Sequence, residues 1–271
     1  MLPPLMFPVP RPLIAAHRGA VGLAPENTIA AFDHAVDAGA DLVELDVHLT
    51  RDGGLVAVHD VTTTRTTGRA HFVHELTVAQ LRSLDAGAGS RIPTLDEVLA
   101  WARDRVYLNL DARNYPALDH DRTTETAEAV VDAIERAGVV DQVIVQCLDH
   151  QLARAVHARW LAITVGITQH GRLHDPVGVA RAAGAQLISG DAAFTTGELV
   201  AELHAGGIGL MTSAELRLPG LHDEPHILRA TTERLLEAGV DIVVTDDVAT
   251  TCAVRATSAE RAPDGATVPV P

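Results

Sequence analysis

Residues 43 to 49 read Val43-Glu44-Leu45-Asp46-Val47-His48-Leu49, a strict alternation of apolar and polar side chains. In an extended strand successive side chains point to opposite faces, so Glu44, Asp46 and His48 share one face. In the wall of a (β/α)8 barrel the apolar face packs on the outer helices. The acidic face then points inward near the C-terminal mouth, where ionised carboxylates are tolerated only if they are paired or metal-bound.

Helix-like and strand-like runs alternate along the rest of the chain, which predicts βα units in a parallel sheet. The eight strand-like runs span residues 13–18, 41–49, 105–112, 142–147, 162–168, 185–191, 207–213 and 241–247. Helices are expected over residues 28–38, 94–104, 123–137, 149–160, 175–183, 195–206 and 224–238. A doubly wound open sheet would share the alternation. However, no G-x-G-x-x-G follows the first run, and polar residues end several different strands, which favours an α/β fold of the (β/α)8 TIM barrel type.

One domain is predicted between a short extension and a tail. The length of 271 residues and the 47% hydrophobic composition suit a single large core. Residues 1–12 form an N-terminal extension whose prolines make a poor signal peptide, and residues 13–257 form the barrel. Residues 61–93 are interpreted as a small insertion after the second strand, and residues 258–271 as a disordered tail.

Charge and composition restrict the partners of the chain. Its formal net charge is −15 and its pI about 5.3, whereas nucleic-acid readers carry a basic face, so DNA and RNA are not expected partners. No run of about 18 uncharged apolar residues occurs, so we expect no stable membrane insertion and a cytoplasmic location. The distant Cys147 and Cys252 have no metal-ligand spacing and are expected to be inert thiols. No feature of the sequence indicates an oligomeric state.

The third strand-like run supplies a partner for the acidic face of the second. In Leu108-Asn109-Leu110-Asp111-Ala112-Arg113 the spacing of two residues places Asp111 and Arg113 on one side. Three carboxylates at one end of a barrel suit a hard divalent cation, Mg²⁺ or Ca²⁺, and no His/Cys cluster with zinc spacing competes. The alternative is a purely structural acidic group held by arginine or by backbone amides.

Two histidines and a further arginine flank this predicted cluster. His17 ends the first strand-like run and precedes Arg18, and His59 ends the short run that follows the Asp52-Gly53 turn. Imidazole titrates near neutral pH, so two histidines can supply one acid and one base, and an arginine can fork onto phosphate oxygens.

Several short motifs in order resemble the glycerophosphodiester phosphodiesterase family. They are His17-Arg18-Gly19, Pro25-Glu26-Asn27-Thr28, Glu44-x-Asp46, His59-Asp60, Arg65-Thr66-Thr67-Gly68, Ile92-Pro93-Thr94-Leu95-Asp96-Glu97-Val98-Leu99 and the closing Thr245-Asp246. The resemblance implies a barrel enzyme that uses one Mg²⁺ or Ca²⁺ to hydrolyse a small phosphodiester, yielding glycerol 3-phosphate and an alcohol. In that family the glycerol 2-hydroxyl of the substrate is thought to attack phosphorus.

The resemblance also implies a role for each matching residue. Glu44, Asp46 and Asp111 would be the metal ligands. Arg18 and Arg113 would bind the phosphate, and His17 and His59 would act as the acid and the base. Four positions depart from the family pattern. Asp111 stands where Glu is usual and Arg113 where Lys is usual, Met211 begins a segment where Trp-Thr-x-Asn is common, and Asp247 stands where an aromatic residue is common. These departures leave the substrate head group open.

The sequence also leaves three other functions open. The first is a phospholipase D-like enzyme of the same superfamily that acts on lysophospholipids. The second is a barrel glycosidase with Glu44 and Asp111 as its carboxylate pair, for which the 3% aromatic content offers few sugar-stacking platforms. The third is a barrel that binds a ligand without catalysis.

Overall fold

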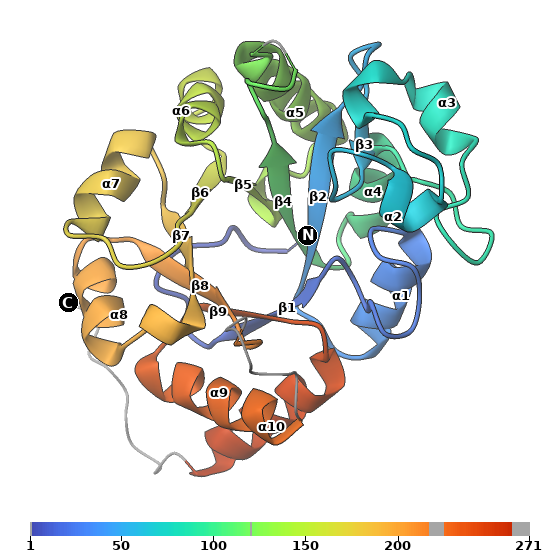
Figure 1. Ribbon diagram of the computed structural model, residues 1–271. Helices are drawn as coiled ribbons and strands as arrows, with labels where there is room; N and C mark the ends of the chain where they lie inside the picture. The colour runs from blue at the N-terminus through green and yellow to red at the C-terminus, as the bar shows by residue number, and fades with distance from the viewer. Residues whose placement is uncertain (1, 120, 217–224, 262–271) are drawn as a thin grey trace.

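The computed structural model describes residues 2–119, 121–216 and 225–261, and a closed barrel of parallel strands lies at its centre. Within the described residues the eight parallel strands are β1 (Leu13–His17), β2 (Leu42–Leu49), β4 (Tyr107–Arg113), β5 (Val143–Cys147), β6 (Thr164–Thr168), β7 (Leu187–Gly190), β8 (Gly209–Ser213) and β9 (Ile242–Thr245). Strand β1 pairs with both β9 and β2, which closes the sheet (Figure 1). The predicted (β/α)8 fold is confirmed, with strand bounds within two residues of those expected.

Helices surround the barrel on its outside (Figure 1). They include α1 (Ile29–Asp37), α4 (Leu95–Ala102), α5 (Thr123–Ala137), α6 (His150–Arg159), α7 (Pro176–Ala183), α8 (Gly197–Ala205), α9 (Pro225–Ala238) and α10 (Val248–Arg261). Every helix expected from the sequence is present with bounds within two residues.

Helix α10 was not predicted. Its threonines are weak helix formers, so its stability comes from packing, in which Val248 and Val254 are buried and the helix contacts α9 and β1. It runs to Arg261, past the start of the tail expected from residue 258, and residues 262–271 lie outside the described residues.

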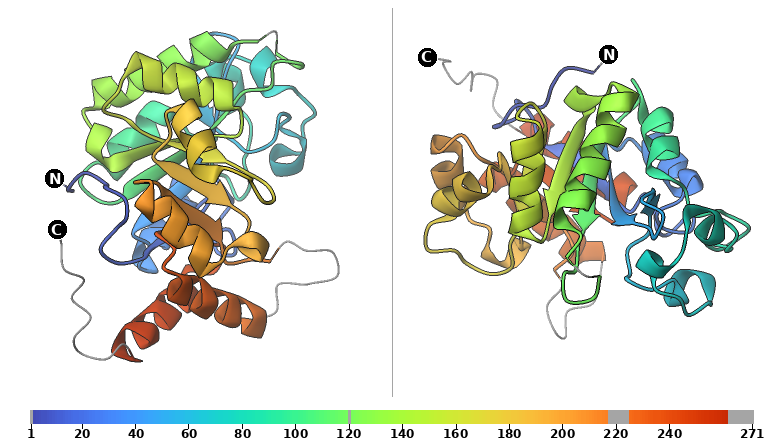
Figure 2. Two further views of the ribbon diagram at one scale, coloured as in Figure 1. Left: turned by 90° about the vertical axis from the view of Figure 1, so that its left-hand side faces the viewer. Right: turned by 90° about the horizontal axis from the view of Figure 1, so that it is seen from above.

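The insertion after β2 starts earlier than residue 61, because β3 (Leu55–Ala57) already leaves the barrel order and pairs antiparallel with β2. It continues through α2 (Thr64–Thr67), η1 (Val73–Glu75) and α3 (Val78–Arg82). A separate apolar cluster that includes Val56, Val73 and Leu81 forms its core. In Figures 1 and 2 the insertion stands at one side of the barrel, next to α1 and α4.

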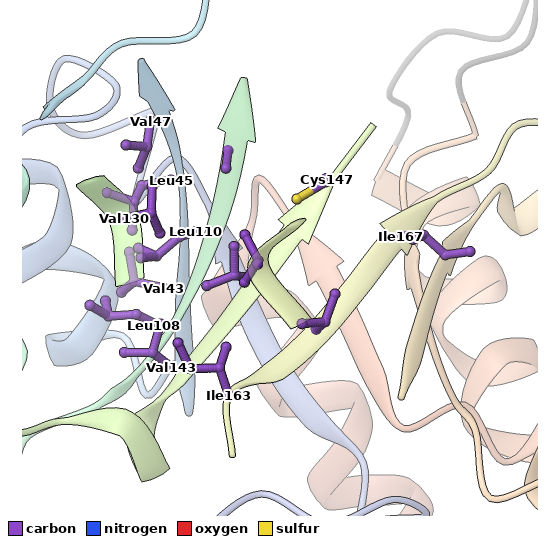
Figure 3. Close-up of a cluster of buried hydrophobic side chains, with 14 of the residues drawn as sticks. Val43, Leu45, Val47, Leu108, Leu110, Val130, Val143, Cys147, Ile163 and Ile167 are labelled. Atoms are coloured by element: carbon purple, nitrogen blue, oxygen red, sulfur yellow. The ribbon is translucent and has the colours of Figure 1, made fainter. Parts of the chain in front are cut away.

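The outward face of the barrel wall forms the main core. Val43, Leu45 and Val47 of β2 lie beside Leu108 and Leu110 of β4, and all five are at most 1% exposed (Figure 3). Fully burying a side chain of this size contributes about 1.5–3 kcal/mol. The same alternation that buries these residues outward turns Glu44 and Asp46 inward.

The N-terminal extension covers the end of the barrel at which the strands begin. Phe7 packs into the cluster of strand-start residues, and a Cβ atom on Gly209 would lie 2.4 Å from its ring. The backbone N–H of Val9 donates to Oδ1 of Asp241 at 2.8 Å. With this end covered, a substrate has to approach from the C-terminal ends of the strands. Among the described residues, no helix has the length and apolar character needed to cross a bilayer.

Candidate active site

Three carboxylates meet inside the barrel at the C-terminal ends of two neighbouring strands. The register of β2 and β4 pairs Asp46 directly with Asp111, and Glu44 lies two residues earlier on the same face of β2. One oxygen from each of Glu44, Asp46 and Asp111 lies within 4.8 Å of the others, and all three residues are buried. The structure therefore brings together the three predicted metal ligands.

These carboxylates fit a hard divalent cation. Oδ1 of Asp111 and Oδ1 of Asn109 are buried acceptors that receive no hydrogen bond from any described residue. Burial raises the pKa of Asp111 to about 8; the Arg113 guanidinium opposes this rise, and the negative charges of Asp46 and Glu44 add to it. Burial and Asp46 also raise the pKa of Glu44. An all-oxygen donor set with unsatisfied negative charge is what Mg²⁺ or Ca²⁺ binds.

Both predicted phosphate-binding arginines border the carboxylates. Arg113 Nη2 lies 2.5 Å from Oδ1 of Asp46 and 2.7 Å from Oδ2 of Asp111. The backbone N–H of Arg18 donates to Glu44 Oε2 at 2.9 Å, and its Nε lies 3.4 Å from Asp46 Oδ2 without forming a hydrogen bond. Arginine and a backbone amide thus do hold the acidic group, as the structural alternative proposed, but they leave Oδ1 of Asp111 without a donor.

A tight turn after β1 presents the Arg18 backbone to the carboxylates. Arg18 and Gly19 have φ angles of 52° and 86°, the left-handed conformation that glycine adopts without strain. A Cβ atom on Gly19 would lie 2.8 Å from the backbone of Ala31, so the turn also needs glycine for its approach to α1.

The two predicted acid–base histidines line the same cavity, and each contacts a carboxylate. His17 Nδ1 lies 2.7 Å from Oδ1 of Asp246, and His59 Nδ1 lies 2.6 Å from Oδ1 of Asp60. Burial lowers the pKa of His17, but Asp246 and Glu44 outweigh burial and the pKa is raised. Burial lowers the pKa of His59, which stays below its ordinary value. The two imidazoles therefore differ in the protonation state that they favour.

His48, which shares the inward face of β2 in the sequence pattern, lies outside this cavity wall. Its Nε2 donates to the backbone carbonyl of His59 at 3.1 Å, and its ring stacks on Tyr115 with 6.2 Å between centroids. Burial lowers the pKa of His48 to about 4, so the ring is neutral at pH 7. The hydrogen bond from His48 holds the segment after β3 that carries His59.

The cavity above these groups has a volume of about 260 Å³. His17, Arg18, Glu44, His59, Asp111 and Arg113 form one wall. The opposite wall comes from β5 to β9 and includes Gln146, Thr168, Ser189, Met211 and Ser213. Gln146 is fixed at both ends, because its Oε1 accepts from Asn109 and its Nε2 donates to Thr168. Met211 and Ser213 belong to the segment that departs from the family pattern, whereas Gln146, Thr168 and Ser189 carried no signal in the sequence beyond their position in a strand.

Other residues of the recognised motifs hold the predicted site residues in place. Asn27 donates to Oδ2 of Asp46 at 2.9 Å and accepts from the backbone N–H of Asp46 at 3.1 Å. Glu26 Oε1 lies 3.2 Å from Nη1 of Arg18. The motif Pro25-Glu26-Asn27-Thr28 was visible in the sequence, but these contacts cross from a loop to a strand and no local pattern encodes them.

Comparison with known proteins agrees with this geometry. Residues 17–250 match the model of the glycerophosphoryl diester phosphodiesterase family. A glycerophosphodiester phosphodiesterase from Caldanaerobacter subterraneus is 34% identical over 247 residues, which cover 87% of this chain and 94% of that protein. This sequence match spans nearly the whole barrel.

Solved structures share the fold. A glycerophosphodiester phosphodiesterase from Agrobacterium tumefaciens has a TM-score of 0.74 at 25% identity, over 90% of this chain and 99% of that one. A phosphodiesterase from Oleispira antarctica, solved in complex with the product sn-glycerol-3-phosphate, has a TM-score of 0.78 at 23% identity, over 90% and 96% of the two chains. On the family match and the near-complete overlap with a 34% identical relative, this chain belongs to the glycerophosphoryl diester phosphodiesterase family.

Proposed function

We propose that this chain is a metal-dependent phosphodiesterase that hydrolyses glycerophosphodiesters to glycerol 3-phosphate and an alcohol at the mouth of the barrel. The observation that carries the proposal is the convergence of Glu44, Asp46 and Asp111 to within 4.8 Å, next to two arginines, in a chain of this family.

Glu44, Asp46 and Asp111 would hold one Mg²⁺ or Ca²⁺. When bound, the cation supplies positive charge to a phosphate oxygen in the transition state. Asn27 keeps Asp46 oriented through two hydrogen bonds, so the ligand set is organised by protein contacts before substrate arrives.

Arg18 and Arg113 would bind the phosphate. Nε of Arg18 is a buried donor that forms no hydrogen bond with any described residue, and a phosphate oxygen is the acceptor that such a donor lacks. Arg113 is shared between Asp46 and Asp111. A cation on those carboxylates would compete for their charge and leave the Arg113 fork more available to substrate.

His17 and His59 would move the protons. Each ring has its Nδ1 against a carboxylate, which favours the tautomer with hydrogen on Nδ1 and makes Nε2 the exchanging atom. His59, with its lowered pKa, would accept the proton of the glycerol 2-hydroxyl as the new O–P bond forms. His17, with its raised pKa, would protonate the leaving alcohol as its O–P bond breaks. Water then opens the cyclic phosphate with the two roles reversed. Each histidine contributes roughly 10²–10⁴-fold.

A substrate panel tests the proposal. Glycerophosphocholine, glycerophosphoethanolamine, glycerophosphoglycerol and lysophosphatidylcholine micelles are each incubated with the purified chain and Mg²⁺ or Ca²⁺. Glycerol 3-phosphate is measured enzymatically for the deacylated diesters, and released choline is measured for lysophosphatidylcholine, whose other product would be lysophosphatidic acid. Product from the deacylated diesters that EDTA abolishes is expected. Product from lysophosphatidylcholine alone would identify a lysophospholipase D instead, and no product from any diester with either metal would favour a binding barrel.

A further inference from the structure

Arg65, on the short helix α2 of the insertion, contacts two carboxylates at once. Its Nη1 and Nη2 donate to Oε2 and Oε1 of Glu26 at 2.6 and 2.7 Å. Its Nε and Nη2 donate to Oδ2 and Oδ1 of Asp60 at 2.8 and 3.1 Å. One planar guanidinium is therefore bidentate toward both Glu26 and Asp60, although these two acids lie 34 positions apart in the sequence.

Each of these carboxylates also holds a residue of the proposed machinery. Glu26 Oε1 lies 3.2 Å from Nη1 of Arg18, and Asp60 Oδ1 lies 2.6 Å from Nδ1 of His59. The contacts form one continuous chain of the form Arg18–Glu26–Arg65–Asp60–His59. It joins the turn after β1 to the segment after β3 through the insertion.

We propose that Arg65 is a positioning residue that sets the placement of the Arg18 guanidinium relative to the His59 imidazole. This inference rests on the proposed function, because it assumes that Arg18 binds phosphate and that His59 moves a proton. Arg65 itself lies outside the residues that line the cavity, so it acts through the two carboxylates.

Geometry and charge both support this role. A bidentate guanidinium fixes the plane of each carboxylate, and a misplacement of about 1 Å in a catalytic group can cost about 100-fold in rate. Arg65 also supplies the positive charge that offsets Glu26 and Asp60. Its hydrogen bonds are the main cause of the low pKa of Asp60, about 2, and they help to hold the pKa of Glu26 down against the effect of burial.

Hydrogen bonds within the insertion hold the short helix that carries Arg65 in a fixed conformation. Thr63 is fully buried, its hydroxyl donates to the carbonyl of Arg69, and the Thr67 hydroxyl donates back to the Thr63 carbonyl at 2.8 Å. Gly68 ends the helix with a φ of 67°, in the left-handed conformation. The Arg65-Thr66-Thr67-Gly68 motif therefore forms a short helix with fixed ends, which places the Arg65 side chain between Glu26 and Asp60.

The test compares Arg65→Met with Arg69→Met. Arg69 lies on the same insertion and is exposed, and its side chain makes no hydrogen bond or ion pair with any described residue, so Arg69→Met removes the same charge without the bridge. We expect Arg65→Met to lower kcat/KM by about 10- to 100-fold and Arg69→Met to change it by less than about 2-fold. Arg65→Lys should recover only part of the loss, since an ammonium group keeps the charge but cannot bind each carboxylate in a planar, bidentate manner.

A second readout separates positioning from a general loss of stability. Glu26→Gln in the Arg65→Met background should cost less than in the wild-type chain, because the bridge is already broken. The His59 imidazole, followed by NMR and assigned with His59→Gln, should titrate at higher pH in Arg65→Met, because Asp60 is no longer offset. If Arg65→Met is unfolded at the assay temperature, Arg65→Lys provides both readouts.

The outcomes separate the two proposals. A wild-type chain that is inactive on every glycerophosphodiester removes the proposed function, and the NMR titration still decides whether Arg65 acts on His59. An active wild-type chain with equal kinetics in Arg65→Met and Arg69→Met, and additive effects with Glu26→Gln, would overturn the role of Arg65 alone.

Discussion

Nδ1 of His17 lies 2.7 Å from Oδ1 of Asp246, so a side chain at the end of the first strand meets one that follows the last strand, 229 residues later. Closure of the barrel makes this pair, because β1 and β9 are hydrogen-bonded neighbours. Glu215, in the bend that follows β8, stabilises the arrangement, because its Oε1 accepts from the backbone N–H of Asp246 at 2.7 Å and from the Thr245 hydroxyl at 2.9 Å.

Asp246→Asn should lower kcat by about 10- to 100-fold. The carboxylate helps to raise the pKa of His17, and a neutral amide would let that pKa fall. The kcat/KM–pH profile measures this effect, and the limb assigned to the acid should move to lower pH in the variant. A profile that keeps the wild-type limb would exclude Asp246 from a role in setting the proton affinity of His17.

His17→Ala and His59→Ala should each lower kcat by about 100-fold or more without loss of the fold. Steady-state assays on the best substrate of the panel measure the loss, and thermal unfolding checks the fold. His34→Ala is a matched control, since His34 is exposed on α1, away from the cavity lining. Near-wild-type turnover in either site variant would remove that histidine from the mechanism.

Mg²⁺ or Ca²⁺ should raise the Tm of the wild-type chain, because a ligand that binds only the folded state stabilises it by mass action. Asp111→Asn removes one carboxylate of the three and should reduce the metal-induced shift to near zero. Glu128→Gln, which removes an exposed carboxylate on α5, should keep the full shift. Differential scanning calorimetry with and without EDTA measures the metal-induced shift in Tm, and an equal shift in both variants would argue against Asp111 as a ligand.

Asp41, at the opposite end of the barrel, should contribute stability and not activity. It accepts from Ile14 N–H at 2.9 Å and from Arg11 Nη2 at 2.6 Å, and it also pairs with Arg255. Burial disfavours the charge of Asp41, but these donors outweigh burial and its pKa is lowered. We expect Asp41→Asn to cost about 1–3 kcal/mol at pH 7 with unchanged kcat.

The sign of the pH dependence follows from the lowered pKa. The contribution of Asp41 is complete above the unfolded pKa of about 3.9 and disappears as the pH falls through the lower folded value. Urea denaturation of both chains at pH 7 and near pH 3 should therefore show a difference that shrinks in acid. A difference that grows on acidification would contradict the assignment.

Periodicity along the chain sufficed for most of the barrel. Runs of Val, Ile and Leu that end in a polar group located the strands, since a parallel strand covered on both sides needs such a run. Periodicity did not predict helix α10, because its threonines do not favour a helix and its stability comes from contacts with α9 and β1. It also placed the start of the insertion too late, because the three-residue β3 gains its strand character from pairing with β2.

The ligand set was readable for the same reason. Glu44 and Asp46 alternate with buried aliphatic residues, and parallel pairing of β2 with β4 brings Asp111 level with Asp46. The residues that hold the histidines and Arg18 in place belong to motifs visible in the sequence, but no local pattern predicted which partners they contact. Asp246, Glu26 and Arg65 reach their partners from a closing strand, a loop and an insertion. Alternation within one strand specifies which way a side chain faces, whereas its neighbour across the barrel mouth depends on how distant segments close and pack.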